Sequence, residues 1–262
     1  MKILLINPRW AHIYGPYKYA AETSRIPPTG LLYLAAYLFK CCKQKHHIRI
    51  IDAEAERLSY GNIQRSIETL NPDIVGISST TPLFPEAKKI ASIAKQVSKE
   101  TCVICGGPHV TALPKESLQE CESIDIIVRG EGEITFSELV SALEVEEEIS
   151  KIDGIAFRDR GEIQLTPPRA FVENLDTLPF PARQLIKNNL YKYSALVSEE
   201  FTLTTMETSR GCPYNCIFCY PMFGKKIRFR SVENVLDEMN EVVHKFGVNF
   251  IYFIDDTMTL NR

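Results

Sequence analysis

Short runs of apolar residues alternate with helical patterns over the first half of this chain, and this order restricts the folds open to it. Five runs are predicted as strands: residues 3–6, 48–52, 73–78, 102–105 and 125–128. Helical spacing of apolar residues appears near 29–42, 61–70, 84–99, 114–121 and 132–144. Continuously apolar strands separated by helices are typical of a parallel sheet covered on both faces. The pattern predicts a doubly wound α/β domain with a flavodoxin-like strand order over residues 1–145.

The carboxyl ends of these strands are the expected place for a ligand site. In a doubly wound sheet the ligand lies beyond the carboxyl ends, where the strand order reverses. Hydroxyl groups follow the third predicted strand and a Gly-Gly pair follows the fourth. Hydroxyl donors and a backbone that can approach a ligand closely therefore lie at the same edge of the sheet. Taken singly, such runs are also typical of turns and helix caps. We expect the site to be lined by His12, Ser78, Ser79, Thr80, Thr81, Gly106, Gly107 and His109.

Farther along the chain, three cysteines form the pattern C-x3-C-x2-C. Cys212, Cys216 and Cys219 follow a β-branched run at residues 201–208, in a stretch broken by glycine and proline that indicates a loop. Thiolates are the usual ligands of iron–sulfur clusters, and a cluster held only by cysteine needs four of them. No cysteine follows Cys219 in the sequence. The spacing therefore predicts a cluster with one iron left for a small, exchangeable ligand.

A zinc site is the main alternative for these three cysteines. It needs a fourth Cys or His nearby, and the candidate, His244, lies in a predicted helix farther along. The other five cysteines indicate reduced thiols rather than a disulfide framework, because the apolar run after Met1 is too short for a secretory leader. These features favour a cluster in a cytoplasmic protein.

The charge balance bears on possible partners. Lys and Arg number 30 and Asp and Glu 33, so the chain lacks the positive field that favours nucleic acid or an anionic membrane. The longest apolar segment, residues 31–39, is far below membrane-spanning length. We therefore expect neither nucleic acid nor a membrane as a partner.

With Phe218 before the last cysteine, the cysteine motif resembles the C-x3-C-x-aromatic-C signature of the radical S-adenosylmethionine (radical SAM) superfamily. The resemblance implies a [4Fe–4S] cluster on Cys212, Cys216 and Cys219, with S-adenosylmethionine chelating the fourth iron and contacting Phe218. It implies that an electron from the reduced cluster cleaves S-adenosylmethionine to a 5′-deoxyadenosyl radical. An electron donor such as flavodoxin or ferredoxin is then implied as a partner.

Residues 1–145 resemble the vitamin B12-binding domain that precedes many radical SAM domains. The segments that carry this resemblance are Gly106-Gly107-Pro108-His109 and Arg129-Gly130-Glu131-Gly132-Glu133. It implies that the Ser/Thr run at residues 78–81 and the Gly-Gly pair line the pocket for the nucleotide tail of cobalamin, and that His109 touches the corrin. Glu131 and Glu133 belong to the motif, and their simplest role is charge at a helix N-terminus.

One departure from related cobalamin proteins concerns the cobalt ligand. Proteins that bind cobalt through histidine carry D-x-H-x-x-G after the first strand, and this chain has Trp10 in the place of the aspartate that orients the imidazole. His12 and Gly15 fit the motif, so His12 stays a candidate axial ligand. We expect cobalamin to be held without a histidine ligand.

The remainder of the chain is predicted as a linker and the start of a second domain. Residues 146–200 form the linker, with a β-hairpin at 155–157 and 162–165, and residues 201–262 run strand, cluster loop, helix (232–246) and strand (248–254). This order resembles the first βαβ unit of a TIM-barrel-like radical SAM domain. By this resemblance Asp255 and Asp256 contact the amino end of S-adenosylmethionine, and Arg228 and Arg230 face its carboxylate or the substrate, or are simply solvated.

A radical SAM core needs several more βα units than residues 201–262 supply. We therefore expect this domain to be truncated, and a missing C-terminal half or a second subunit to cover its last strand. We expect this chain by itself to bind cobalamin without catalysing a reaction.

The combined resemblance implies a cobalamin-binding radical SAM enzyme that methylates, or closes a ring, at an unreactive carbon of an unidentified small molecule. The alternative from another class is a non-catalytic corrinoid-binding or electron-carrier module. A third option, the methylthiotransferase branch, would need a second cluster from N-terminal cysteines. Cys102 and Cys105 lie in an apolar predicted strand, which favours buried structural thiols instead.

Overall fold

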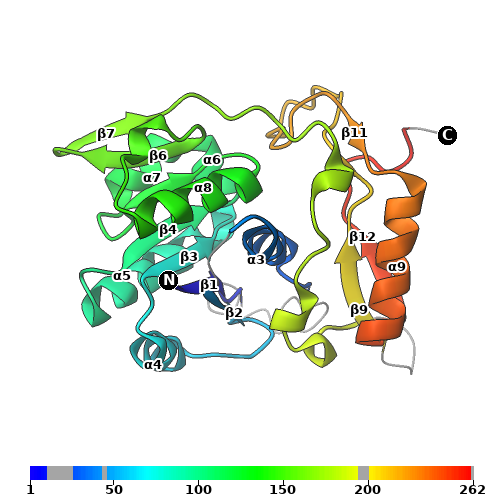
Figure 1. The fold of residues 1–262 in the computed structure, drawn as a ribbon, viewed down its shortest axis with the longest axis horizontal. Coiled ribbons are helices and arrows are strands. Elements are labelled where there is room, and N and C mark those ends of the chain that lie inside the picture. The colour runs from blue at the N-terminus through cyan, green and yellow to red at the C-terminus, as the bar shows by residue number, and fades with distance from the viewer. Residues whose placement is uncertain (11–25, 43–45, 194–200, 261–262) are drawn as a thin grey trace.

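The computed structural model describes residues 1–10, 26–42, 46–193 and 201–260 (Figure 1). One seven-stranded sheet has the order β2-β1-β3-β4-β5-β6-β7. The first five strands along the chain are parallel, and the last two are antiparallel. Their bounds are β1 (Lys2–Asn7), β2 (His47–Asp52), β3 (Ile74–Ser78), β4 (Cys102–Gly106), β5 (Ile126–Val128), β6 (Ile155–Asp159) and β7 (Glu162–Leu165). The predicted flavodoxin-like order 2-1-3-4-5 is confirmed, with its reversal between β1 and β3.

Alternate residues of the strands face opposite sides of the sheet, and each side has its own core. In β1, Leu4 and Ile6 pack on one face, while Ile3 and Leu5 pack on the other. Helices α3 (Thr29–Cys41) and α8 (Gly132–Glu144) cover the Leu5 face. The Leu4 face is covered by α4 (Tyr60–Leu70), α5 (Phe84–Val97), α6 (Pro108–Ala112) and α7 (Pro114–Glu120). Burial on both faces explains why the strands read as unbroken apolar runs.

The hairpin predicted in the linker is present, and it continues the sheet. Strand β6 pairs antiparallel with β5, placing Ile126 opposite Phe157, and β6 and β7 pair in turn. Ile155 and Ala156 are fully buried, one in each core. Short 3-10 turns punctuate the described chain: η1 (Thr81–Leu83), η2 (Ile149–Lys151), η3 (Leu175–Thr177), η4 (Arg183–Leu185) and η5 (Asn188–Leu190).

Beyond the connecting segment, the chain forms the predicted strand, helix, strand unit. Strand β9 (Phe201–Met206) pairs in parallel with β12 (Phe250–Phe253), and α9 (Val232–Phe246) connects them. The Ser231 side chain caps α9 by accepting from the Asn234 backbone N–H, and Gly247 ends it with φ 65°. Three two-residue strands complete this region: β8 (Lys192–Tyr193), β10 (Ser209–Arg210) and β11 (Arg228–Phe229).

The segment that connects the two regions makes buried polar contacts with both of them. Tyr191 donates to Asp52 at the end of β2, with 2.9 Å between the oxygens. Burial and the charge of Asp52 raise the pKa of Tyr191 well above its ordinary value, so this phenol stays protonated. Arg183 of the connecting segment is buried between Thr204 and Glu238, with 2.6 Å from Nη2 to the Glu238 carboxylate. The connecting segment therefore supplies contacts to the domain that follows it.

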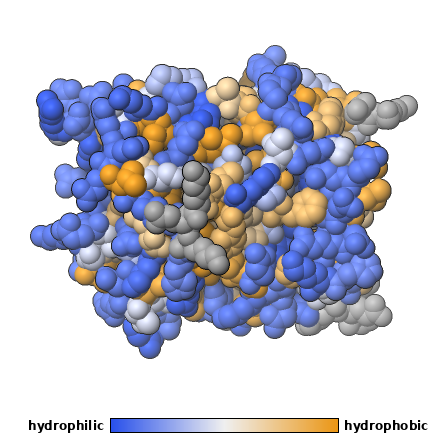
Figure 2. Space-filling view, viewed as in Figure 1, coloured by the Kyte–Doolittle hydropathy of each residue, from blue (hydrophilic) through white to orange (hydrophobic). Residues whose placement is uncertain are grey.

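The surface of the molecule is mixed in character. Hydrophilic side chains predominate over the face shown in Figure 2, with apolar side chains between them. On α9, Val232, Leu236 and Val243 are each about half or more exposed. Among the helices that the structure describes, none is both long and apolar enough to cross a membrane.

Candidate functional site

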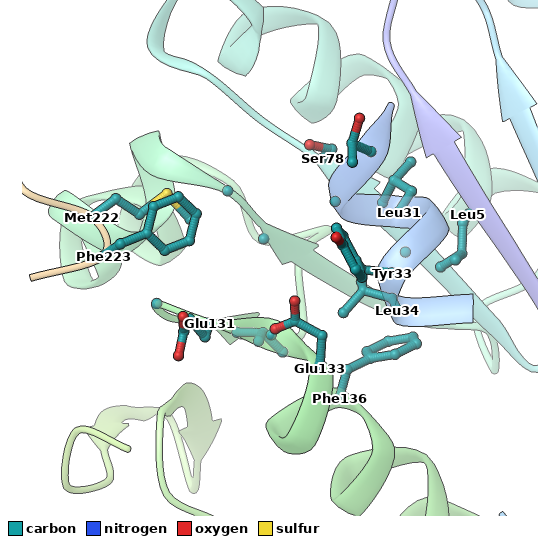
Figure 3. Close-up of a pocket in the computed structure, with 18 of the residues that line it drawn as sticks. Leu5, Leu31, Tyr33, Leu34, Ser78, Glu131, Glu133, Phe136, Met222 and Phe223 are labelled. Atoms are coloured by element: carbon teal, nitrogen blue, oxygen red, sulfur yellow. The ribbon is translucent and has the colours of Figure 1, made fainter. Parts of the chain in front are cut away.

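A cavity of about 210 Å³ lies at the carboxyl ends of β1, β3 and β4, between α3 and α8. We call it the tail cavity. Leu5, Leu31 and Leu34 form one side, and Phe136 of α8 lies near them (Figure 3). The other apolar side chains in its wall are Ile77, Ile104, Val128, Met222, Phe223 and Ile254. The cavity opens where the strand order reverses, which is where sheets of this type bind ligands.

Glycines make room for this cavity and for the turn beside it. A Cβ at Gly76 would lie 2.6 Å from Cδ2 of Leu5, so a larger residue in β3 would press on the cavity wall. Gly107 has φ 103°, and a Cβ there would lie 2.6 Å from the Ser79 backbone oxygen. The loop after β3 and the loop after β4 therefore contact each other at Gly107, a position that only glycine fits.

Replacing Gly107 by alanine is expected to lower the free energy of unfolding by on the order of 1–3 kcal/mol, because both the positive φ and the Ser79 backbone oppose a Cβ. Gly106→Ala is the matched control. Its Cβ would have the Val128 oxygen as nearest atom, at 3.7 Å, and the cost should stay within about 1 kcal/mol. Urea unfolding of the two variants checks this. Equal losses would contradict the role given to Gly107.

The predicted tail-site residues divide into two groups. Ser78, Gly106 and Gly107 line the tail cavity. The others lie beside it, outside its wall: Ser79, Thr80, Thr81 and His109. His12 falls outside the described residues.

His109 is held at the rim of this edge. Its Nδ1 lies 3.3 Å from the Thr81 hydroxyl, and its ring stacks at 4.2 Å on Phe84. Partial burial lowers the pKa of His109, so the neutral imidazole is favoured near pH 7. The Thr80 hydroxyl is buried without a hydrogen-bond partner in the described part of the chain. A polar ligand group is the natural partner for such an atom.

A second cavity, of about 240 Å³, is lined by all three cysteines of the motif. We call it the cluster cavity. Its remaining lining residues are Tyr214, Asn215, Tyr220, Pro221, Lys225 and Asp256. Cys216 and Cys219 are exposed and Cys212 is partly buried, so the three thiols face open space. The structure thus brings together the three predicted cluster ligands and one of the two predicted aspartates.

The loop that carries the cysteines is fixed at both ends by backbone contacts. Gly211 has φ 98°, and the Lys226 backbone oxygen leaves no room for a Cβ there. The Gly211 N–H donates to Asp256 at 3.2 Å, and the Cys212 N–H donates to the Gly224 oxygen at 3.1 Å. The Thr257 hydroxyl donates to the Cys212 sulfur at 3.2 Å. Residues at the end of β12 therefore orient the first cysteine.

The donor set fits a cluster better than a single ion. Within the described ranges, no three His, Cys, Asp or Glu side chains stand close enough together to bind one metal ion. The three thiols instead surround a cavity, as ligands to different irons would. Among the residues that the structure describes, neither a fourth cysteine nor a histidine lines it, whereas structural zinc sites close with four protein ligands.

Two residues predicted for S-adenosylmethionine lie outside the wall of the cluster cavity. Phe218 is 89% exposed. Asp255 accepts hydrogen bonds on Oδ1 from the Thr208 backbone N–H at 2.9 Å and the Ser209 hydroxyl at 2.7 Å. Its Oδ2 is buried without a partner among the described residues. This oxygen is free to accept from a bound group.

A buried ionic group that the sequence analysis did not identify lies between the two regions. Arg210 Nη2 lies 2.7 Å from Glu133, and its Nε lies 2.7 Å from Glu207. Arg228 Nη1 lies 2.7 Å from Glu131, which is also 3.1 Å from Arg210. Each side chain is less than 10% exposed. Glu131 and Glu133 lie at the N-terminus of α8, as expected, and they are also counter-ions to Arg210 and Arg228.

Burial and the neighbouring charges together set the pKa values of this ionic group. Burial raises the pKa of Glu207, and the neighbouring arginines only partly oppose it. Burial alone would lower the pKa of Arg210, but the charges of Glu133 and Glu207 outweigh it and hold that pKa well above its usual value. Arg210 therefore stays charged, as a buried arginine surrounded by carboxylates must.

The geometry defines an α/β ligand-binding domain joined to a three-cysteine loop. Two protein families match these two regions. The B12 binding domain family matches residues 21–140, and the radical SAM superfamily matches residues 206–262. The chain belongs to the B12-binding-domain-containing radical SAM family.

Two curated relatives match this chain over its whole length. An uncharacterised methyltransferase from Pyrococcus horikoshii is 39% identical over 100% of this chain and 55% of its own length. An anaerobic magnesium-protoporphyrin IX monomethyl ester cyclase from Cereibacter sphaeroides is 30% identical over 100% of this chain and 42% of its own. The chain spans about half the length of the curated relatives it matches.

Two solved structures share the fold. The radical S-adenosylmethionine methyltransferase TsrM from Kitasatospora setae, with cobalamin and a [4Fe–4S] cluster bound, has a TM-score of 0.71 at 19% identity. This match covers 97% of this chain and 47% of TsrM. The cobalamin-dependent radical enzyme OxsB, with aqua-cobalamin bound, has a TM-score of 0.78 at 21% identity, over 97% of this chain and 34% of OxsB.

Proposed function

We propose that this chain binds a [4Fe–4S] cluster on Cys212, Cys216 and Cys219, S-adenosylmethionine at the open iron, and cobalamin with its nucleotide tail in the tail cavity. The observation that carries the proposal is the placement of two cavities on either side of one loop. The cysteines line one, and Met222 and Phe223 of the same loop line the other. The chemistry these groups supply when bound is a 5′-deoxyadenosyl radical and a methyl-carrying or redox-active cobalt.

The apolar wall of the tail cavity supports a base held away from the metal. Leu5, Leu34 and Phe136 suit the flat ring of a nucleotide base, while Ser78 and the Gly-Gly pair offer donors and close backbone at the opening. These residues would hold the nucleotide tail of cobalamin in the cavity, and His109 at the rim would lie toward the corrin.

Aspartates at the end of β12 would hold the amino end of S-adenosylmethionine. Asp256 lines the cluster cavity, and the unpartnered Oδ2 of Asp255 is a buried acceptor close in sequence to it. Carboxylates suit an ammonium group. Phe218, largely exposed beside the last cysteine, offers an apolar face to the adenosine.

The reaction class that fits is methylation or ring closure at an unreactive carbon of a small molecule. Both activities occur among the relatives named above, a methyltransferase and a cyclase. The cluster requires an electron donor such as flavodoxin or ferredoxin. Eight free cysteines suit the reducing cytoplasm.

Anaerobic reconstitution with iron and sulfide, followed by titration with hydroxocobalamin, tests the proposal. We expect about four irons per chain, and an absorption or electron-resonance spectrum of the cluster that changes when S-adenosylmethionine is added. We also expect a stoichiometric, base-off cobalamin spectrum. Tight cobalamin binding without a cluster would instead identify a corrinoid carrier, and binding of neither would refute the proposal.

A further inference from the structure

The loop from Gly211 to Gly224 has a face toward each cavity. Cys212 and Cys219 line the cluster cavity, and Met222 and Phe223 line the tail cavity. In Figure 3, Met222 and Phe223 lie across the tail cavity from Leu5 and Leu31. A displacement of this loop therefore alters both cavities together.

The residue that precedes this loop is Arg210, which fastens it to the α/β domain. Its guanidinium spans Glu133 at 2.7 Å and Glu131 at 3.1 Å, both at the start of α8. The same guanidinium lies 5.2 Å from the ring centres of Tyr33 and Phe223. Arg210 thus touches the α/β domain and the cavity-lining part of the loop at once.

The contacts of Arg210 are also part of the tail-cavity wall. Tyr33, Glu133, Glu207 and Phe223 all line the cavity, as does Arg210 itself. On the other side, the neighbouring Gly211 is bonded to Asp256 of the cluster cavity. A planar guanidinium with several fixed N–H groups holds such a geometry better than a flexible ammonium.

We propose that Arg210 is a positioning residue that couples the two sites, so that the tail in its cavity and the cluster on its cysteines each stabilise the same placement of the loop. The inference rests on the proposed function, because it concerns how those two sites communicate. It adds that the α8 glutamates act through Arg210 on the cysteine loop.

Coupling of this kind is reciprocal. If assembly of the cluster favours the loop position that closes the tail cavity, cobalamin must bind more tightly to the cluster-loaded chain, by the same factor that it favours the cluster. Couplings between sites are commonly about 5- to 150-fold. We expect a ratio of about fivefold or more between the cobalamin dissociation constants of the cluster-free and cluster-loaded chains.

The experiment measures this ratio by anaerobic equilibrium dialysis with hydroxocobalamin in three proteins: wild type, Arg210→Gln and Arg183→Gln. Arg183 is the matched control, because it is equally buried and paired with Glu238 but lines neither cavity. The ratio should fall to about one in Arg210→Gln and persist in Arg183→Gln. The Arg183→Gln variant should still bind each group separately, because Arg183 lines neither cavity.

A ratio of one in the wild type, or an unchanged ratio in Arg210→Gln, would overturn the inference. An equal loss in Arg183→Gln would show general destabilisation and would overturn it too. If Arg210→Gln fails to fold or to bind cobalamin, Arg210→Lys decides: it keeps the charge but loses the planar fork, and a full wild-type ratio there refutes the positioning role. Binding of neither cobalamin nor cluster by the wild type would instead refute the proposed function.

Discussion

Replacing Cys216 by alanine is expected to remove the iron–sulfur cluster from the reconstituted chain. Cys216 is one of the three thiols around the cluster cavity, and no further cysteine or histidine of the described ranges lines that cavity to replace it. Two thiolates do not retain a cluster that needs at least three. Iron and sulfide analysis should fall from about four of each per chain to near zero. The change of spectrum on adding S-adenosylmethionine should disappear as well.

The control for this loss is Cys41→Ala. Cys41 is also an exposed thiol, but it ends α3 and does not line the cluster cavity. Its replacement should leave the iron content at the wild-type value. Because Cys216 is exposed and packs in no described core, Cys216→Ala should also keep the unfolding midpoint of the apo chain. Retention of a full cluster by Cys216→Ala would contradict the ligand assignment.

The elements that the sequence predicts well are those set by local pattern. The parallel strands are continuous apolar runs because both faces are covered, and their order along the chain with intervening helices leaves few topologies. The cysteine loop is visible because its ligands are close together in sequence. The helix after it begins at a Ser231 cap and ends at Gly247, both of which are local signals.

The ionic group between the two regions could not be predicted in this way. Arg210 lies 79 residues from Glu131 and 77 from Glu133 in the sequence, and an isolated charged residue has the same local pattern whether it is solvated or buried. Only tertiary packing makes them counter-ions. The basic residues flanking the cysteine motif are not a usable signal, because Arg210 and Arg228 are buried whereas the neighbouring Lys225 and Lys226 are exposed.

The aromatic and methyl-rich wall of the tail cavity was missed for a similar reason. Tyr33 and Leu34 belong to the amphipathic pattern of α3, and such residues are predicted as core. Met222 and Phe223 follow the last cysteine without periodicity. The topology brings these two sets together across the cavity, which no local pattern records.

Replacing Gly30 by leucine is expected to weaken cobalamin binding on the order of 10- to 100-fold while leaving the fold intact. Gly30 lies in the first turn of α3 and borders the tail cavity, and a Cβ there would meet no atom of the described residues within 4 Å. The leucine side chain therefore has space in the empty protein, but it occupies room that the nucleotide tail would need. A helical glycine replaced by leucine also gains helix propensity, so the free energy of unfolding should stay equal or rise.

The same substitution at Gly61 separates these two effects. Gly61 occupies the same position in α4 as Gly30 does in α3, the second helical residue, and its Cβ would meet only the Ser59 hydroxyl at 3.9 Å. It lies on the opposite face of the sheet, away from the tail cavity. Gly61→Leu should match Gly30→Leu in stability and the wild type in cobalamin affinity. Equal affinity for cobalamin in both variants would place the tail elsewhere, because a side chain at the rim of its cavity cannot be neutral to it.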